Sequence, residues 1–417
     1  MLDLPPTHTS THPLILGHEI AGRISTTNTT NTTTKKTTHS HPNLHLPPGT
    51  PVLVDPRLIC HSCPQCRTAS TEPEPEPQSQ GCAAGLSFVG FSTSVQGGGF
   101  AARVRVDPRA VHVLPSRPPL ASSLASSEEE EEEEEGGGLL QAGKKKKKKG
   151  VQDELLLRDA ALVEPLSVAW HAVKRAGVVG VPGWVGGGDG GVVEGEKAKG
   201  VSALIVGGGP VGVAVAFVLR AWGVGTVVLS EPVAARREAR GVREVVDVVV
   251  DPVGESVVDR CKEVTGGRGV DVVFECSGSP RVVGDVFGSV GWRGVVVVVA
   301  LWTGEVPVPF APLMYKECTV TSSCAFNEKD FAEVIKAFAE GQFVRNELEK
   351  WTEAHIRPDR FKGVSCMITA RISLEDVVQK GFGELQKPDN THLKILVTPK
   401  SFSAAEGDCG LSRASKV

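Results

Sequence analysis

A glycine-rich turn between an apolar strand and an apolar helix constrains the fold of this chain more than any other feature. The run ALIV is followed directly by GGGPVG and then by the helix-like stretch VAVAFVLRAWG. The glycines occupy the three positions of G-x-G-x-x-G, a turn that lets a pyrophosphate approach the backbone at a helix N-terminus. The turn therefore predicts a dinucleotide site formed by Gly207, Gly209, Pro210, Val211 and Gly212.

The sequence around this turn alternates short β-branched runs with stretches long enough to form helices. Six strands are predicted, at 203–207, 226–231, 245–251, 270–276, 295–301 and 318–323. Helices are predicted between them, at 210–223, 232–241, 255–267 and 280–291. This alternation is typical of a parallel sheet with helical crossovers. It predicts a doubly wound α/β domain.

An acidic residue at the end of the second predicted strand bears on the choice of cofactor. Glu231 follows Gly212 by 19 residues. A carboxylate at this place accepts hydrogen bonds from the adenosine ribose hydroxyls and repels a 2′-phosphate, which favours NAD over NADP. Arg236 is a further candidate for cofactor binding, and Arg236 or Arg237 would weaken the preference for NAD by attracting a phosphate.

Four cysteines form a cluster with the spacing of a metal site. Cys60, Cys63 and Cys66 are spaced C-x2-C-x2-C, and Cys82 follows. Four thiolates close a tetrahedral zinc shell with no open position, so this zinc would be structural and would pin a loop that has little core of its own. The chain has 10 cysteines in 417 residues, which favours metal binding in a reducing compartment over a disulfide framework. Four free thiols are the alternative.

Charge and apolar run length exclude several classes of function. The chain has 45 Lys and Arg residues against 49 Asp and Glu residues, a net charge of −4, so no basic field favours nucleic acid. The longest apolar run, at 295–302, is far shorter than the roughly 20 residues that span a bilayer. We therefore expect a soluble, cytoplasmic protein with neither nucleic acid nor membrane as a partner.

Two low-complexity insertions interrupt the chain. The first covers 25–41 and is rich in Thr and Asn; the second, at 126–150, contains runs of Glu and Lys. Neither composition can bury apolar surface, so both are predicted to be solvated loops. Residues 401–417 are predicted to be a frayed tail.

A second set of possible metal ligands is incomplete. His18 and Glu19 lie in GHE before a β-like run, and Glu164 lies in VEPLSVAWHAV at the start of a helical stretch. Taken alone, a His-Glu pair is more often a surface or core feature than a metal ligand.

A resemblance to a known family changes that weight. LGHEIAG, the DPR-x3-C-x2-C-x2-C cluster, GGGFA, ALVEPLSVAWHAVKR, IVGGGPVG, GVDVVFECSG and HLKILV occur in this order. Together they resemble the zinc-containing medium-chain dehydrogenase/reductase family, closest to the (R,R)-2,3-butanediol dehydrogenase branch and near sorbitol and threonine dehydrogenases. The resemblance runs from Leu14 to Val397.

The resemblance implies a GroES-like, β-rich catalytic domain in two pieces, with a Rossmann domain inserted between them. The expected boundaries are 1–178 for the first piece, 179–323 for the NAD-binding domain, 324–400 for the closing piece and 401–417 for the tail. The first piece is implied to be truncated at its N-terminus.

The resemblance also implies roles for individual residues. His18 corresponds to a ligand of the catalytic zinc, and Glu19 and Glu164 correspond to carboxylates that bind this metal directly or through its water. The cysteine cluster corresponds to the structural zinc site, although the family usually has a shorter gap before the fourth cysteine. Three further positions are implied to contact the cofactor near its adenosine and nicotinamide, namely Ser277, Ala300 and Leu301.

The implied activity is zinc-dependent, NAD-linked oxidation of an alcohol, with a vicinal diol such as 2,3-butanediol as the expected substrate and a ketol as the product, or the reverse. The implied assembly is a homodimer or homotetramer. The family has a further zinc ligand, a cysteine upstream of GHE, whereas the first cysteine here is Cys60. A ligand and an N-terminal strand are therefore expected to be missing, and turnover is expected to be impaired.

Two other classes of function stay open. One is a protein that binds NAD and structural zinc without turnover, and the other is a zinc-free reductase of activated double bonds. About two zinc ions per chain would favour the dehydrogenase, one the binding protein and none the reductase. The role of Trp302 also stays open: it lines the substrate cleft or closes the sheet edge.

Overall fold

The computed structural model describes most of the chain. The described residues are 14–25, 46–67, 81–83, 85–91, 97–116, 154, 156–177, 198–302, 304–343, 363–387 and 390–399. Apart from Ser25, both predicted insertions lie outside these ranges, as does the predicted tail. No helix within the described ranges is long and apolar enough to cross a membrane.

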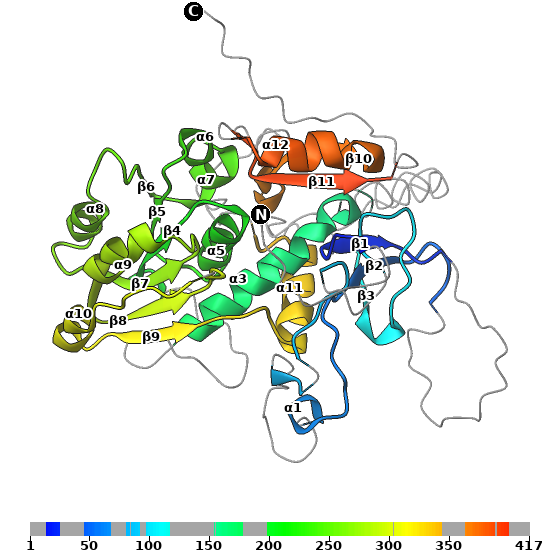
Figure 1. Cartoon of the computed structure of the whole chain (residues 1–417), viewed down its shortest axis with the longest axis horizontal. Helices are drawn as coiled ribbons and strands as arrows, with labels where there is room; N and C mark the ends of the chain where they lie inside the picture. Colours follow the sequence, from blue (N-terminus) through cyan, green and yellow to red (C-terminus); the bar gives the residue numbers. More distant parts are fainter. Residues whose placement is uncertain are drawn as a thin grey trace, which may run out of the picture.

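A six-stranded parallel sheet dominates one side of the molecule (Figure 1). Its strands are β4 (Ser202–Val206), β5 (Thr226–Ser230), β6 (Val248–Val250), β7 (Val270–Glu275), β8 (Val290–Val298) and β9 (Thr319–Ser322). They lie in the order β6-β5-β4-β7-β8-β9, and every neighbouring pair is parallel. The chain therefore winds in opposite directions from β4, and the switch point lies between β4 and β7. In such sheets ligands bind at the carboxyl ends of the strands beside this point.

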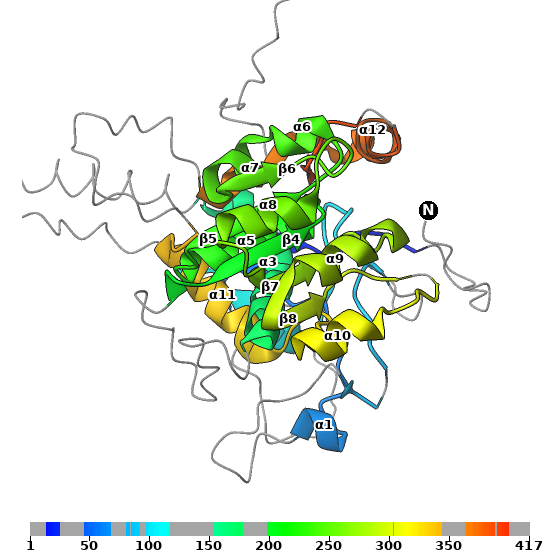
Figure 2. The same ribbon diagram turned by 90° about the vertical axis from the view of Figure 1, so that its left-hand side faces the viewer.

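The strands are rich in Val, Leu and Ile because the sheet is covered on both faces. One face packs against α3 (Val163–Ala176), α5 (Pro210–Ala221) and α7 (Arg240–Val245). The opposite face packs against α8 (Val257–Val264) and α9 (Val283–Ser289). Figure 2 shows the sheet between these helices. The alternation of core residues along β4 follows from this burial, since Ala203 and Ile205 face one layer and Leu204 and Val206 the other.

The structure differs from the sequence prediction at three elements of this domain. The helix predicted at 232–241 is divided into α6 (Ala234–Arg237) and α7. β8 begins at Val290 rather than at 295, because it passes through Trp292 and Arg293, whose exposed side chains interrupt the apolar run. The crossover to β9 contains α10 (Phe310–Lys316), which was not predicted because it buries no residue and so has no core-facing pattern.

The remaining strands form two small sheets on the other side of α3 (Figure 1). β1 (Ile20–Arg23), β2 (Pro51–Val54) and β3 (Val111–Val113) form an antiparallel sheet, and β10 (Ile368–Ser373) pairs with β11 (Lys394–Thr398) in parallel. α11 (Glu328–Glu340) packs against α3. The shorter helical elements are α1 (Pro64–Arg67), η4 (Pro108–Ala110), η5 (Ala160–Leu162), η6 (Pro280–Val282), η9 (Gly363–Met367), η10 (Leu374–Asp376), the π-helix η11 (Val377–Phe382) and α12 (Gly383–Leu385).

Candidate functional site

Three predicted ligands come together where the segment before β1 meets the first turn of α3. One ligand atom of each of His18, Glu19 and Glu164 lies within 4.8 Å of the others. His18 and Glu19 immediately precede β1, and Glu164 lies in the first turn of α3. The fold thus joins residues that are far apart in the sequence into one cluster of an imidazole and two carboxylates.

Tight backbone packing fixes the position of His18. The Gly17 amide donates to the Gly90 carbonyl at 3.1 Å, and the Gly99 amide donates to the Gly17 carbonyl at 2.6 Å. A Cβ atom on Gly90 would lie 2.0 Å from the Gly17 carbonyl oxygen, and Gly90 has a φ of +75°. A side chain at position 90 would therefore displace the loop that carries His18.

Burial shapes the electrostatics of this cluster. Burial, together with the charge of Glu19, raises the pKa of the Glu164 carboxyl to about 8. Burial also lowers the pKa of the His18 imidazole, which favours its neutral, ligating form. Lys394, the first residue of β11, forms an ion pair with Glu19.

The donor set fits a zinc ion. One imidazole and two carboxylates are ligands that zinc takes, and a catalytic zinc site has three protein ligands and a position for water or substrate. A bound cation would also stabilise the ionised form of the buried Glu164 carboxylate. Zinc would be held by His18 and Glu164, with Glu19 shared between the metal and Lys394.

Aromatic side chains border the cluster. The rings of Phe88 and Phe91 lie with their centroids 6.4 and 6.1 Å from that of His18. Their segment is held to the exit of β2, because the Leu58 amide donates to the Ser87 carbonyl and the Val89 amide to the Pro56 carbonyl, both at 2.8 Å. The wall beside the imidazole is therefore apolar.

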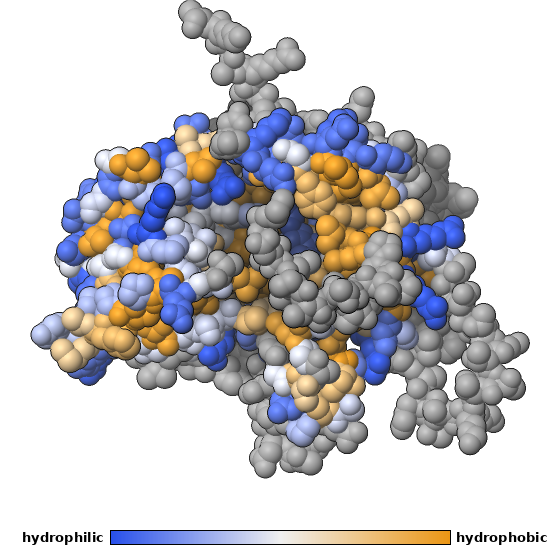
Figure 3. Space-filling model, in the orientation of Figure 1, coloured by the Kyte–Doolittle hydropathy of each residue, from blue (hydrophilic) through white to orange (hydrophobic). Residues whose placement is uncertain are grey.

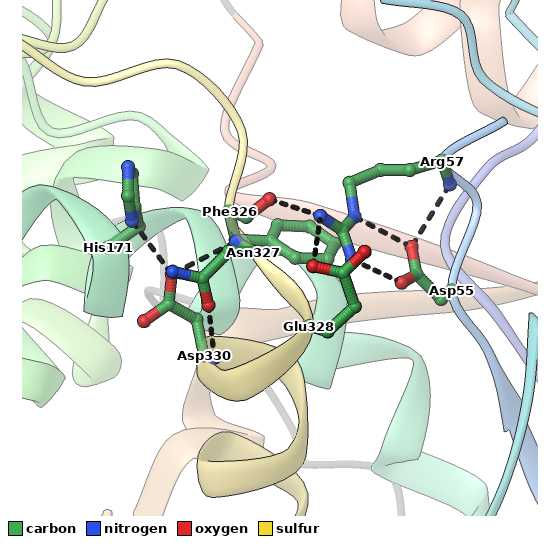
Figure 4. A network of polar contacts seen from close by, with 7 residues as sticks. All are labelled: Asp55, Arg57, His171, Phe326, Asn327, Glu328 and Asp330. Atoms are coloured by element: carbon green, nitrogen blue, oxygen red, sulfur yellow. Dashed lines mark hydrogen bonds and ion pairs between the residues drawn. The ribbon is translucent and has the colours of Figure 1, made fainter. Parts of the chain in front are cut away.

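A buried arginine ties the same exit of β2 to the start of α11 (Figure 4). The Arg57 guanidinium pairs with Asp55 at 2.5 Å and donates to the Phe326 carbonyl at 2.6 Å. It also lies over the Phe326 ring, 4.7 Å from the centroid. These contacts fix the segment that leads from β2 into the cysteine cluster.

The four clustered cysteines also meet. One sulfur atom of each lies within 4.8 Å of the others. Hydrogen bonds from Ser62 and Cys63 lower the pKa of Cys60 to about 5, whereas burial and its neighbours raise the pKa of Cys66 to about 12. Backbone amides donate to these sulfurs, as from Ala83 to Cys63 at 3.5 Å, and such bonds stabilise thiolates. Four sulfur ligands and these amides fit a closed zinc shell.

The glycine turn has the geometry that a dinucleotide requires. Gly207 has a φ of +102°, and a Cβ atom on Gly212 would lie 2.0 Å from the Gly207 carbonyl oxygen. Pro210 and Val211 are the first residues of α5, so the N-terminus of this helix lies at the turn. Free amide groups at a helix N-terminus bind phosphate. The turn therefore fits a pyrophosphate.

The Glu231 carboxylate lies directly beside this turn. It accepts hydrogen bonds from the Gly208 and Val233 amides, each at 2.8 Å, and is 3% exposed. The Arg236 guanidinium lies 3.9 Å from it. The sheet places Ser277 in the loop after β7 and Ala300 and Leu301 in the loop after β8, at the same carboxyl edge.

Two features of this region were not predicted from the sequence. Lys394 begins the otherwise largely apolar run KILVT, and nothing in the sequence links it to Glu19. Glu275 ends β7 and binds both neighbouring loops through its buried side chain. An acidic residue at the end of a parallel strand was the only signal for it.

Comparisons with protein families match two segments of the chain. Residues 210–340 match the family described as zinc-binding dehydrogenase, and residues 3–116 match the alcohol dehydrogenase GroES-like domain. Together with the six-stranded parallel sheet, these matches confirm the predicted fold class.

Individual relatives agree with the family matches. An (R,R)-butanediol dehydrogenase of Neisseria gonorrhoeae is 32% identical over 60% of this chain, a match that spans only 59% of the relative's own length. An (R,R)-butanediol dehydrogenase of Saccharomyces cerevisiae is 27% identical over 93% of this chain and 81% of its own. The crystal structure of 2R,3R-butanediol dehydrogenase from Bacillus subtilis superposes with a TM-score of 0.62 at 22% identity, covering 93% of this chain and 82% of that one, which shows a shared fold.

Proposed function

Because the chain belongs to the zinc-binding medium-chain dehydrogenase family, we propose that it is a zinc-dependent, NAD-linked dehydrogenase that interconverts a vicinal diol, such as 2,3-butanediol, and its ketol. The observation that carries the proposal is the meeting of His18, Glu19 and Glu164 in one cluster. The butanediol dehydrogenases among the relatives support the choice of a vicinal diol.

Zinc bound at the cluster would supply a Lewis acid for the substrate oxygen, and the nicotinamide would exchange hydride with the substrate carbon. The residues of the chain bind and orient the two partners. His18 and Glu164 would hold the metal, and the ion pair with Lys394 fixes the Glu19 carboxylate. Phe88 and Phe91 place apolar rings beside the His18 imidazole.

A direct assay tests this function. The zinc-loaded full chain should oxidise NADH when acetoin is added, and removal of zinc with a chelator should stop the reaction. Turnover that continues without zinc would favour the zinc-free reductase instead.

A second candidate function rests on the ligand set. Among the residues that the structure describes, the cluster around His18 contains no thiolate. An N/O shell of this kind would support a protein that binds NAD and zinc without turnover. Zinc and NADH binding in the absence of any acetoin-dependent oxidation would establish it.

The cofactor preference gives a prediction at Glu231. We expect Glu231→Gln to weaken NADH binding about tenfold. The ratio of the NADPH dissociation constant to the NADH dissociation constant should fall by a similar factor, because the charge that repels a 2′-phosphate is lost. Dissociation constants for both cofactors, measured by fluorescence titration, check this. Glu238→Gln removes an exposed charge nearby and should change neither value. If the ratio of the two dissociation constants were the same in Glu231→Gln as in the wild type, Glu231 would not be the residue that sets the cofactor preference.

The assembly gives a second prediction. β9 is one of the two edge strands of the sheet, and in the neighbouring α10 the exposed fractions of Phe310 and Met314 are 76% and 65%. Apolar side chains gather over α10 at the lower left of Figure 3. Unpaired strand edges and exposed apolar patches favour association. We propose that two copies of the chain pair at β9 and α10. Sedimentation of the wild type should therefore give a dimer, and sedimentation of Phe310→Glu should give a monomer. A monomeric wild-type chain would contradict this pairing.

A further inference from the structure

Glu275 is a buried carboxylate at the end of β7 whose oxygens bind two different loops. The side chain is 3% exposed. Its Oε1 atom accepts from the Ser277 amide at 2.8 Å, the Ser277 hydroxyl at 2.6 Å and the Gly278 amide at 2.9 Å. Its Oε2 atom accepts from the indole Nε1 of Trp302 at 3.0 Å. The first set holds the loop after β7, and the Trp302 bond holds the loop after β8.

The main chain of Glu275 binds the second loop as well. Its carbonyl oxygen accepts from the Val299 amide at 2.9 Å and from the Ala300 amide at 3.0 Å. The segment 299–302 is therefore held at its beginning by the backbone and at its end by the side chain of the same residue. Among the described residues of this loop, Trp302 is the only one that hydrogen-bonds to the side chain of Glu275.

These loops form a continuous row with the glycine turn. A Cβ atom on Gly207 would lie 3.0 Å from the Ser277 amide nitrogen, and one on Gly278 would lie 3.0 Å from the Leu301 carbonyl oxygen. The three loops after β4, β7 and β8 thus touch in order along the carboxyl edge of the sheet.

The sheet order tells which end of a dinucleotide meets the last loop. Glu231 ends the β5 side of the switch point, where it is placed for an adenosine ribose, and the glycine turn after β4 is placed for the pyrophosphate. The other half of the dinucleotide must therefore extend across the ends of β7 and β8. The loop that Trp302 fixes lies at this end.

We infer that Glu275 and Trp302 are positioning residues that set the β8 loop against the nicotinamide half of the cofactor. The inference rests on the proposed function, because it requires a bound dinucleotide. It gives Trp302 a role beyond the two left open from the sequence: the indole nitrogen ties down the loop after β8, and β9 lies outside β8 at the edge of the sheet.

The chemistry of the pair explains why a carboxylate and an indole stand here. Every partner of the Glu275 side chain is a donor, so both of its oxygens must accept. A glutamine would turn an NH2 group toward one of these donors. Phenylalanine at position 302 would keep an aromatic ring and remove the N–H donor together with part of the indole's volume, a loss of volume that Trp292→Phe reproduces elsewhere in the chain. The loss of a hydrogen bond to a buried charged group changes the equilibrium constant that depends on it by about tenfold or more.

The test compares two ligands that share the adenosine and pyrophosphate. NADH and ADP-ribose are titrated into the full chain by calorimetry. Trp302→Phe should raise the dissociation constant for NADH about tenfold and leave that for ADP-ribose within about twofold, because ADP-ribose lacks the nicotinamide. Trp292→Phe is the matched control, since Trp292 lies near the start of β8, the strand before the Trp302 loop, and is 64% exposed. This variant should change neither dissociation constant.

A second variant guards against a general loss of structure. Glu275→Gln should show the same selective loss for NADH with a larger factor, and Trp302→Phe carries the test if Glu275→Gln does not fold. Equal losses for both ligands, or no loss in Trp302→Phe, would overturn the inference while leaving the proposed function intact. A wild-type chain that binds neither ligand would overturn both.

Discussion

Replacement of His18 by alanine is expected to remove zinc from the cluster of His18, Glu19 and Glu164 and to lower kcat/KM by about a thousandfold or more. A metal ion acting as a Lewis acid contributes several kcal/mol to transition-state stabilisation, and each 1.4 kcal/mol or so corresponds to a factor of about ten in rate. Among the residues that the structure describes, the imidazole is the only nitrogen ligand of the cluster. The two remaining carboxylates would bind zinc weakly.

Metal analysis and NADH oxidation by acetoin, measured on the same preparation, check this prediction. The zinc at the cysteine cluster should remain, because its ligands are separate from His18. His392→Ala is the matched control, since its half-buried imidazole lies beside Thr369 and outside the cluster. A His18→Ala chain that keeps the activity of the wild type would exclude His18 from the reaction.

Replacement of Asp330 by alanine is expected to lower the free energy of unfolding by about 3–5 kcal/mol, because it removes a fully buried carboxylate that binds His171 and Lys174 and completes the capping box of α11. Asp330 is fully buried in α11, where its carboxylate accepts from the Asn327 amide at 3.0 Å and contacts the His171 Nδ1 atom at 2.7 Å (Figure 4). Lys174 lies 2.9 Å from the same carboxylate. These contacts join α11 to the helix that carries Glu164.

Thermal unfolding measures this loss, and we expect the midpoint to fall by on the order of 10 °C. Asp259→Ala, which removes an exposed carboxylate from α8, should change the midpoint by a degree or so. A similar small change in Asp330→Ala would show that the pairing of α3 and α11 does not depend on this network.

The same residue gives a pH dependence with a defined sign. Burial opposes ionisation, but the bonds to His171, Lys174 and Asn327 together hold the pKa of the Asp330 carboxyl below its usual value. A depressed pKa contributes stability that is fully present above the ordinary carboxyl value of about 3.9 and is lost as the pH falls through the folded value. The difference in stability between the wild type and Asp330→Ala should therefore shrink below about pH 4.

The sequence predicted those parts of the fold that depend on local pattern. The glycine turn and the strand that precedes it are adjacent in the sequence, so Gly207 and Gly212 predicted a turn whose observed geometry fits a dinucleotide. The short spacing of Cys60, Cys63 and Cys66 likewise indicated a cluster that the structure brings together. A strand with exposed residues near its start, such as Trp292 in β8, gave no continuous apolar run and was placed too late in the chain.

Contacts between segments that are distant in the sequence were harder to predict. No periodicity links His18 to Glu164, and only the family resemblance suggested that the two meet, which the geometry now shows. The ion pair of Lys394 with Glu19 depends on β11 lying beside the residues that precede β1, a contact that a single sequence does not encode locally. The bond between Trp302 and Glu275 depends in the same way on the parallel register of β7 and β8.

The most direct test of this account is the position of zinc in crystals of the full chain grown with zinc and NADH, located by anomalous scattering at the zinc absorption edge. The account predicts one ion among the four cysteine sulfurs and a second among His18, Glu19 and Glu164, facing the nicotinamide across the end of β8. A fully active crystal preparation with no zinc at the second position, or with NADH bound away from the glycine turn, would contradict it.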